Sequence, residues 1–304
     1  MKRTYLSFLL LLAISISCSG CVSEEGDLSE DWNSLVESAN QNLEDGNVQN
    51  SKIVDALADQ ELEEAESLID DASESYAIAL YDIGKLMEHT SGEKFLEDYV
   101  RAWQGQVGEI LNGLEYMRIM VNIDIFNVEF YKITALHPNA QLQLTQAFGH
   151  YNEGEFSAAI NSADASRNKY ATIGEVSSAL IPVAEGIGEP YVIEYVNNIY
   201  ALSTTALSCL DDIIAASQHS LEGNLEEAVD SIESAGSEYE SYVGTLDVLI
   251  NIESSHPNAF PSQEMALGGL RGTYLSMKEN SDSLAEGYGI KMQEIEEEHK
   301  DFFE

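Results

Sequence analysis

The sequence predicts an all-α protein built from stacked antiparallel helix hairpins, either repeat-like or bundled, with several long helices. Two observations support this fold class. One motif recurs in residues 60–76, 150–170 and 219–239, with its apolar residues at helical spacing. No alternating strands joined by a hairpin turn occur in the chain. Each helix is therefore expected to bury one face against its neighbours.

The recurring motif places three side chains on one face of a helix. A Leu or Phe precedes an Ala by three residues, and a Tyr follows that Ala by eleven. Because an α-helix repeats every 3.6 residues, these positions fall on one stripe, which we expect to lie in the core. The triplets are Leu62, Ala65 and Tyr76; Phe156, Ala159 and Tyr170; and Leu225, Ala228 and Tyr239.

Three helices are expected in the first half of the chain. Ser29 can cap the first, and Gly46 is expected to end it. The second is expected to run unbroken through residues 48–87, whose apolar residues alternate three and four apart. The third includes residues 121–136, which alternate partly like a strand but have no partner strand, and it is expected to end at Pro138.

The second half contains two further internal matches. The tetrapeptide His-Pro-Asn-Ala occurs at residues 137–140 and 256–259, which predicts two equivalent corners of a duplicated structure. The related segments 95–100 and 191–196 each open a long helix. Pro182 is expected to kink or end the helix that contains it, and Pro190 begins the next one well.

The best internal boundary in the sequence is the glycine-containing break between Gly186 and Pro190. It divides an N-terminal helical region, residues 29–187, from a C-terminal helical region, residues 188–304. We expect the two regions to form one continuous helical array.

The chain is strongly acidic, with 54 Asp and Glu against 14 Lys and Arg in 304 residues, for a net charge of −40. Its 44% hydrophobic content is enough for a core, so it is not a disordered acidic tail. The charge argues against nucleic acid as a partner, since that binding depends on neutralising phosphates. Such a surface repels anionic lipid headgroups and attracts cations non-specifically.

The N-terminus has the form of an export signal. Lys2 and Arg3 precede an apolar run at residues 5–16, which is short for a bilayer span but suits a secretory signal. We therefore expect residues 1–20 to be a signal peptide and the mature protein to be exported.

Ser19 and Gly20 before Cys21 resemble the lipobox of prokaryotic lipoproteins, with Cys18 in the place where a Leu is usual. The resemblance implies lipidation of Cys21, a tether at residues 21–28, and anchoring to the outer face of the cytoplasmic membrane. Cys18 is the alternative lipidation site, and the residues before it fit the pattern less well. Cys209 is expected to be a small buried hydrophobe.

The hairpins also resemble tetratricopeptide repeats, over roughly 30 residues each. The early Trp and the closing Pro of that family are absent, and no 34-residue period persists. The resemblance implies stacked hairpins with a concave protein- or peptide-binding surface. The matching residues are Ala147, Gly154, Phe156, Ala159 and Ala163 in the second copy, and Ala216, Gly223, Leu225, Ala228, Ile232 and Ala235 in the third.

The histidines do not predict a metal site. His150 and His219 each precede a Glu by three residues, but both are expected at helix C-termini, where a His interacts well with the helix dipole. The chain has two Glu-x-x-His spacings, at residues 253–256 and 296–299; one runs into a proline and the other lies in a charged run. We expect no catalytic residues, no metal and no cofactor, and no ligand-binding residue can be assigned.

Two functions remain. The preferred one is a non-catalytic, lipid-anchored cell-surface scaffold that binds a protein or peptide. The alternative is an extracytoplasmic small-ligand receptor or sensor, with a pocket in the bundle near the break at Gly186 and Pro190.

Overall fold

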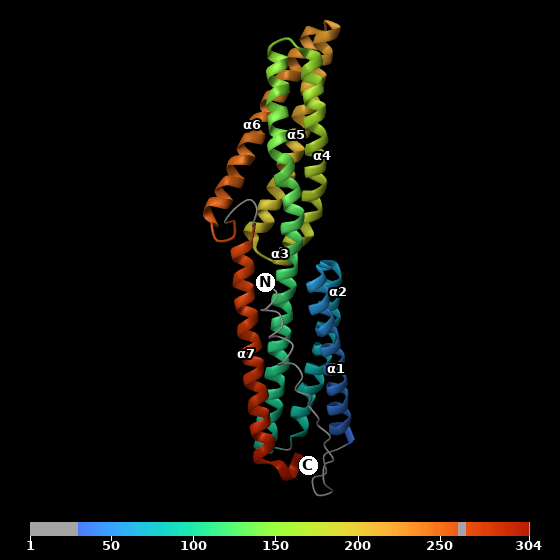
Figure 1. The fold of residues 1–304 in the computed structure, drawn as a ribbon, viewed down its shortest axis with the longest axis vertical. Coiled ribbons are helices and arrows are strands. Elements are labelled where there is room, and N and C mark those ends of the chain that lie inside the picture. The colour runs from blue at the N-terminus through green and yellow to red at the C-terminus, as the bar shows by residue number, and fades with distance from the viewer. Residues whose placement is uncertain (1–29, 91, 261–265, 304) are drawn as a thin grey trace. The chain divides into compact units, whose positions relative to one another are not determined.

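The computed structural model describes residues 30–90, 92–260 and 266–303, and throughout these ranges the protein is helical without a strand (Figure 1). The predicted all-α fold class is confirmed. In order, the helices are α1 Glu30–Asp59, α2 Leu62–Leu86, the short 3₁₀ helix η1 Met87–His89, α3 Lys94–Asn152, α4 Phe156–Ile187, α5 Pro190–Glu222, α6 Leu225–Ser255, α7 Gly268–Glu298 and α8 Lys300–Phe303.

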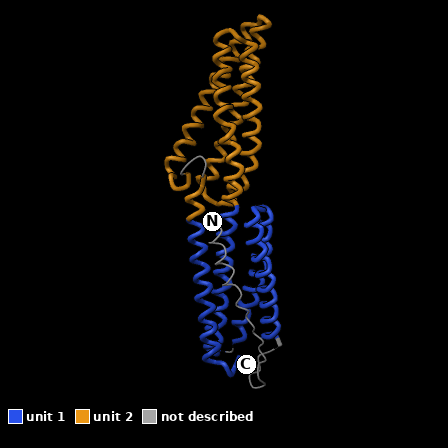
Figure 2. Tube along the Cα trace, in the orientation of Figure 1, with its two compact units in different colours: residues 1–121, 273–304 blue, residues 122–272 orange. Residues whose placement is uncertain are grey.

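The described residues form two compact units (Figure 2). Unit 1 comprises the residues up to Val121 together with those from Thr273 onward, and unit 2 comprises Asn122–Gly272. Unit 1 therefore contains α1, α2, the first part of α3 and most of α7. Unit 2 contains the rest of α3 with α4, α5 and α6. The break at Gly186 lies inside unit 2, as the turn between α4 and α5.

The three copies of the motif each begin a helix directly after a tight turn, which was predicted for the second and third copies but not for the first. The turns before α2, α4 and α6 each contain a residue with positive φ: Gln60 at 63°, Gly154 at 76° and Gly223 at 83°. Glycine adopts this conformation without a steric penalty, whereas Gln60 adopts it at some cost. The turns before α4 and α6 thus form where the sequence predicts them, whereas the turn at Gln60 was not predicted.

Gly46 does not end the first helix, so that prediction was wrong. Helix α1 continues through Gly46 to Asp59, and the expected continuous helix at residues 48–87 is divided at Gln60. A Cβ atom added at Gly46 would lie 2.9 Å from the ring of Tyr76, which is fully buried. Gly46 therefore lets α2 approach α1 closely, and its role is packing.

Pro138 does not end α3, which continues to Asn152 with the proline inside it. A proline removes one backbone hydrogen bond from a helix interior. The apolar stripe on both sides of it is fully or almost fully buried at Ile133, Ala140 and Leu144, and this packing holds the helix together. The second His-Pro-Asn-Ala copy does end a helix, because α6 stops at Ser255. The two copies are therefore not equivalent corners, which corrects the expected correspondence.

The remaining helix boundaries follow local signals. The predicted helix at residues 121–136 is confirmed as part of α3. Helix α4 passes through Pro182 and ends at Ile187, where Gly188 provides a left-handed cap. Helix α5 begins at Pro190 as expected. By length and composition α5 could cross a membrane, but much of it is buried in unit 2, as in the core helix of a globular bundle.

An aromatic clasp joins the start of α5 to the end of α6. The ring of His256 stacks on Tyr191, with centroids 4.0 Å apart and an interplanar angle of 10°. Phe260 follows His256 by four positions, and Tyr195 follows Tyr191 by four. The ring centroids of Phe260 and Tyr195 are 4.7 Å apart. The Tyr195 hydroxyl donates to Glu253 Oε1 at 2.5 Å. The first Glu-x-x-His spacing therefore serves helix packing.

Unit 1 contains the same clasp between the start of α3 and the end of α7 with α8. His299 stacks on Phe95 with centroids 4.1 Å apart at 17°. Phe303 and Tyr99 lie 5.0 Å apart, and the Tyr99 hydroxyl donates to Glu296 Oε1 at 2.7 Å. The second Glu-x-x-His spacing thus has the same structural role as the first.

The two clasps show that the units share one plan. Helices α6 and α7 are both 31 residues long, and their Glu-x-x-His segments lie at the same distance from the helix start. The helices that open with segments 95–100 and 191–196 each follow a glycine with positive φ, Gly92 and Gly188. In unit 2 the clasped helices are consecutive, whereas in unit 1 all of unit 2 separates them in the sequence.

Replacing Tyr195 by Phe is expected to lower the free energy of unfolding by about 1–3 kcal/mol, because a hydrogen bond to a carboxylate is lost. Tyr99→Phe should have a similar effect through the unit 1 clasp. The matched control is Tyr200→Phe on α5, whose side chain is 44% exposed and which should change the stability by less than about 0.5 kcal/mol. Urea unfolding followed by circular dichroism measures all three; equal stability of Tyr195→Phe and Tyr200→Phe would contradict the role of the clasp.

Candidate interaction surface

A buried polar network fixes α6 to the rest of unit 2. The hydroxyls of Tyr170 on α4 and Tyr242 on α6 are 2.7 Å apart, and His137 Nε2 on α3 lies 3.2 Å from the Tyr242 hydroxyl. Burial lowers the pKa of His137, which favours the neutral ring. A neutral His137 can accept from Tyr242, which in turn can accept from Tyr170. Three helices therefore meet at one hydrogen-bonded node.

Further contacts tie α5 to α6. The buried thiol of Cys209 donates to the Ala235 carbonyl with the two atoms 3.3 Å apart, and Ser208 hydrogen bonds to Glu238. Burial raises the pKa of Cys209 to about 12, so its reactive thiolate is disfavoured. The prediction that Cys209 is a buried small hydrophobe is confirmed.

In the first two copies the Ala and the Tyr of the motif are core while Leu62 and Phe156 are half-buried, and in the third copy only the Ala is core. Ala65, Ala159 and Ala228 are buried, as are Tyr76 and Tyr170. On α6, by contrast, Leu225 is 69% exposed and Tyr239 is half-buried. The buried tyrosine on this helix is Tyr242, three residues later. Helix α6 therefore faces the core with one part of its apolar surface and leaves another part uncovered.

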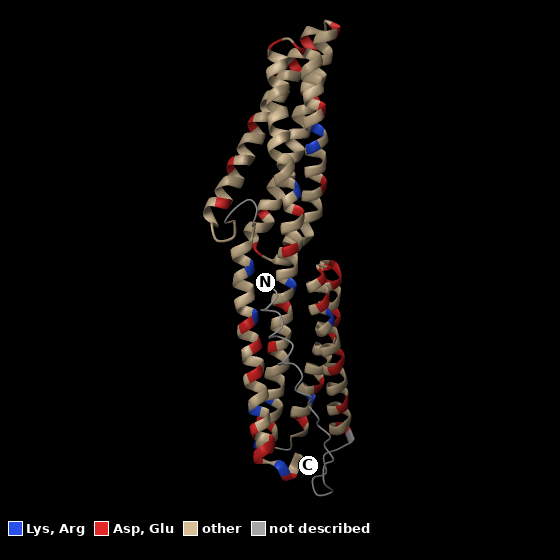
Figure 3. Ribbon diagram, in the orientation of Figure 1, with Lys and Arg blue, Asp and Glu red and all other residues tan. Residues whose placement is uncertain are grey.

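Unit 2 is acidic over a long stretch of sequence. No Lys or Arg occurs between Lys169 and Arg271, whereas sixteen Asp and Glu occur there. This stretch includes the end of α4 and all of α5 and α6. Carboxylates recur along α6 (Figure 3). Its surface should therefore attract cationic groups and repel anionic ones.

The turn between α3 and α4 brings together three possible metal ligands. His150, Glu153 and Glu155 each offer one ligand atom, and these atoms lie within 4.8 Å of one another. His150 Nδ1 already lies 2.8 Å from Glu155 Oε2, an exposed pairing. At the corresponding turn before α6, Asn224 takes the place of Glu155. His150 was expected to interact with the C-terminal end of its own helix, α3. Its ring instead pairs with Glu155, the residue directly before α4.

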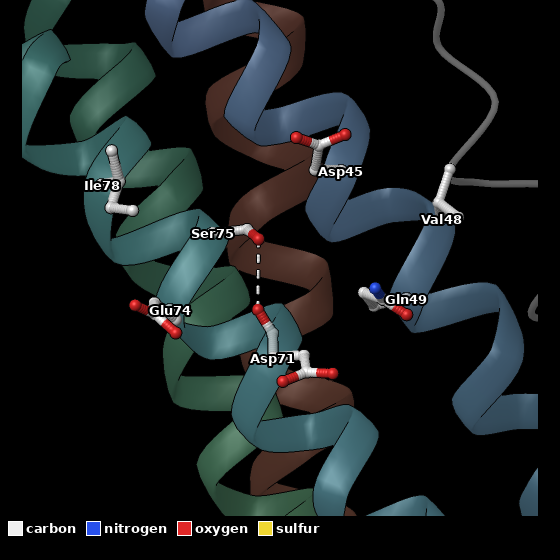
Figure 4. Close-up of a pocket in the computed structure, with 7 residues that line it drawn as sticks. All are labelled: Asp45, Val48, Gln49, Asp71, Glu74, Ser75 and Ile78. Carbon is white, nitrogen blue, oxygen red and sulfur yellow. Dashed lines mark hydrogen bonds between the residues drawn. The ribbon is translucent and has the colours of Figure 1, made fainter.

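A shallow depression of about 340 Å³ lies between α1 and α2 of unit 1 (Figure 4). Its walls carry carboxylates and two exposed apolar side chains, so it is better suited to cations than to anions. The Ser75 hydroxyl donates to the backbone carbonyl of Asp71 inside it. The lining residues are Asp45, Val48, Gln49, Asp71, Glu74, Ser75 and Ile78.

The depression lies on α1 and α2 and not near Gly186, where the alternative function placed its pocket. A Cβ atom at Gly186 would lie 2.8 Å from the Asn122 amide nitrogen, so this turn packs closely against α3. The predicted lipidation residues Cys21 and Cys18 lie outside the described residues.

Sequence reasoning did not identify the node formed by His137, Tyr170 and Tyr242. A heptad analysis of α6 could have placed Tyr242 in the buried row, since it follows Ala228 and Ala235 at seven-residue intervals. The pairing with His137 depends on tertiary packing over 105 residues and has no local signal. No family model, curated protein or solved structure matches the chain.

Proposed function

We propose that this chain is a non-catalytic interaction protein, held outside the cell by a lipid anchor, whose acidic helical surface binds a protein or peptide partner. The observation that carries the proposal is the stretch between Lys169 and Arg271, which lacks basic residues while its helices keep a well-packed core. Such a surface favours cationic partners and disfavours nucleic acid and anionic lipid.

The hairpin architecture supports a binding role by analogy with tetratricopeptide repeats, which present concave surfaces to peptides. The motif matches at the hairpin turns motivate this analogy.

The lipid anchor rests on Cys21. Two acyl chains on this residue would hold the protein at a membrane stably, where one chain gives marginal binding. Mass spectrometry of the mature N-terminus tests this directly, with a diacylated Cys21 expected. A mature chain that begins unmodified at residue 22 or later would remove the anchor from the proposal.

The alternative is a small-ligand receptor or sensor. The observation that favours it is the depression between α1 and α2, whose carboxylates could hold a small cationic ligand. Its open, polar character makes it a weaker candidate than a protein-binding surface, because ligand pockets are mostly apolar and enclose their ligand.

Two measurements on the soluble mature domain separate these functions. Affinity capture from envelope extract at physiological salt should enrich one basic protein or peptide, and high salt should release it. A thermal-shift screen against small metabolites and cations should leave the melting temperature unchanged. A specific metabolite shift without protein enrichment would favour the receptor and reject the scaffold.

A further inference from the structure

Helix α6 carries an exposed apolar row. Val229, Gly236, Val243 and Ile250 follow one another at seven-residue intervals. Seven residues are close to two helical turns, so these positions form one line along the helix. Val229 is 51% exposed, Val243 39% and Ile250 59%. Leu225, at the start of the helix, adds a further exposed apolar side chain on the same side.

An acidic row runs beside it. Glu226, Glu233, Glu240 and Asp247 also recur every seven residues, each three positions before a member of the apolar row. Positions three apart are neighbours on a helix surface, so the two rows are adjacent. All four carboxylates are exposed, and α6 contains no Lys or Arg (Figure 3). The carboxylates are therefore not neutralised by basic residues on their own helix.

The side chains that attach α6 to unit 2 form a separate row. Ala228, Ala235, Tyr242 and Leu249 are buried, and Tyr242 belongs to the node with His137 and Tyr170. The exposed apolar row is thus not required to hold α6 in place. It gives this helix an apolar face wider than the one its bundle covers.

We propose that α6 is the docking site of a cationic amphipathic helix from a partner protein. The apolar stripe of that helix would pack on Val229, Val243 and Ile250, while its Lys and Arg residues would pair with the acidic row. This is a helix-on-helix recognition mode, in which apolar anchors give affinity and flanking charges give orientation. The inference rests on the proposed binding function and names its surface and the class of its partner.

Charge distinguishes this occupant from two others. A second copy of the chain would bring an identical acidic row, so like charges would face each other along the contact. The acidic tether at residues 21–28, with two Glu and one Asp and no basic residue, has the wrong charge as well. Only a basic partner satisfies both rows.

The probe is a synthetic peptide of about 28 residues in four heptads, with Leu at the two core positions and Lys at the flanking ones. Fluorescence anisotropy measures its binding to the mature domain at about 0.15 M salt. One variant set removes the apolar row and another neutralises the acidic row. The substitutions are Val229→Ser, Val243→Ser and Ile250→Ser in the first set, and Glu226→Gln, Glu233→Gln, Glu240→Gln and Asp247→Asn in the second.

Each set has a matched control made of exposed residues elsewhere. The control for the apolar set replaces three exposed aliphatic residues, and the control for the acidic set neutralises four exposed carboxylates. All substituted positions are exposed, and circular dichroism verifies that each variant stays helical. The control substitutions are Val128→Ser, Leu142→Ser and Ile290→Ser, and Glu37→Gln, Glu44→Gln, Glu63→Gln and Asp55→Asn.

Each α6 set is expected to weaken peptide binding by about tenfold or more, because three apolar contacts or four ion pairs are lost. Neutralising the acidic row should also flatten the salt dependence of binding. The control sets should change the affinity by less than about twofold. Equal losses in the α6 and control sets would mean that the peptide binds the acidic surface without a site, which overturns the inference.

Two other outcomes also decide against it. If the domain alone sediments as a dimer that the apolar α6 set dissociates, the occupant is a second copy. If a captured partner is retained by both α6 sets, the docking inference fails while the proposed binding function stands. If no partner is captured at all, the proposed binding function is contradicted. Peptide binding that is lost in the α6 variants would in that case still support α6 as the docking surface.

Discussion

Raising the pH from about 10 to 12 is expected to unfold the protein cooperatively, because four buried tyrosines cannot ionise within the fold. Tyr76, Tyr170 and Tyr242 are fully buried, and Tyr195 is 4% exposed. Burial raises the pKa of Tyr242 to about 12 and raises the pKa values of the other three above the ordinary value of a phenol. Contact with Tyr242 raises that of Tyr170 further.

The free energy of unfolding falls with rising pH because the folded state holds these phenolic protons more tightly than the unfolded chain does. A raised pKa in the folded state means that the fold favours the neutral phenol, while the unfolded chain ionises near pH 10. The stabilisation is complete below about pH 10 and is lost as the pH rises toward the folded pKa. Between about pH 10 and the folded pKa, each tyrosine lowers the free energy of unfolding by about 1.4 kcal/mol per pH unit, so four together lower it by about 5.6 kcal/mol per pH unit, comparable to the whole stability of many domains.

Two signals recorded together test this expectation: the near-ultraviolet absorbance of phenolate and the far-ultraviolet circular dichroism. The four buried tyrosines should ionise in the same transition in which the helical circular dichroism is lost. Tyr170→Phe should reduce the pH slope of the unfolding free energy by one proton, whereas Tyr131→Phe, at a residue 62% exposed, should change it much less. Full ionisation of all tyrosines while helicity persists would contradict their burial.

The fold class, the turns before α4 and α6 and the starts of these two helices could be predicted because they depend on local signals. Helical spacing and turn residues such as Gly154 and Gly223 act over a few positions. The similarity of the segments that open α3 and α5 is visible in the sequence, as are the Glu-x-x-His spacings on α7 and α6. The sequence alone does not pair them, and only the fold brings Tyr195 to Glu253.

The helix ends that were misplaced depend on tertiary packing. Pro138 has the local signature of a helix end, yet α3 continues because its buried stripe extends on both sides of the proline. The same sequence at residues 256–259 ends α6. Identical tetrapeptides thus have different structures, and the difference lies in what packs around them.

The candidate surface on α6 was hidden from the sequence for a related reason. The motif residues Leu225 and Tyr239 fit a helical stripe and were expected in the core, but Leu225 is 69% exposed. Periodicity shows that one face is apolar, but the number of neighbours decides how much of that face is covered. In unit 2 the bundle covers the row through Tyr242 and leaves the adjacent row exposed.

Substituting Gly46 by Ala is expected to destabilise unit 1 by about 1–3 kcal/mol, although Ala is the better helix former. The new Cβ atom would lie 2.9 Å from two ring atoms of Tyr76. That ring is fully buried and its hydroxyl donates to Asn47 Oδ1 at 2.9 Å, so it has little room to move aside. Helices α1 and α2 must then separate, which opens the hairpin core.

Gly108→Ala is the matched control, because Gly108 is also inside a helix and a Cβ atom there would meet nothing within 4 Å. It should stabilise the protein by about 0.5–1 kcal/mol, from helix propensity alone. Combining Gly46→Ala with Tyr76→Leu should show a favourable coupling of roughly 1 kcal/mol or more in urea unfolding, since the smaller side chain vacates the space. If both Gly→Ala variants are stabilised alike, Gly46 would have no packing role, and the close approach of α1 and α2 would need another cause.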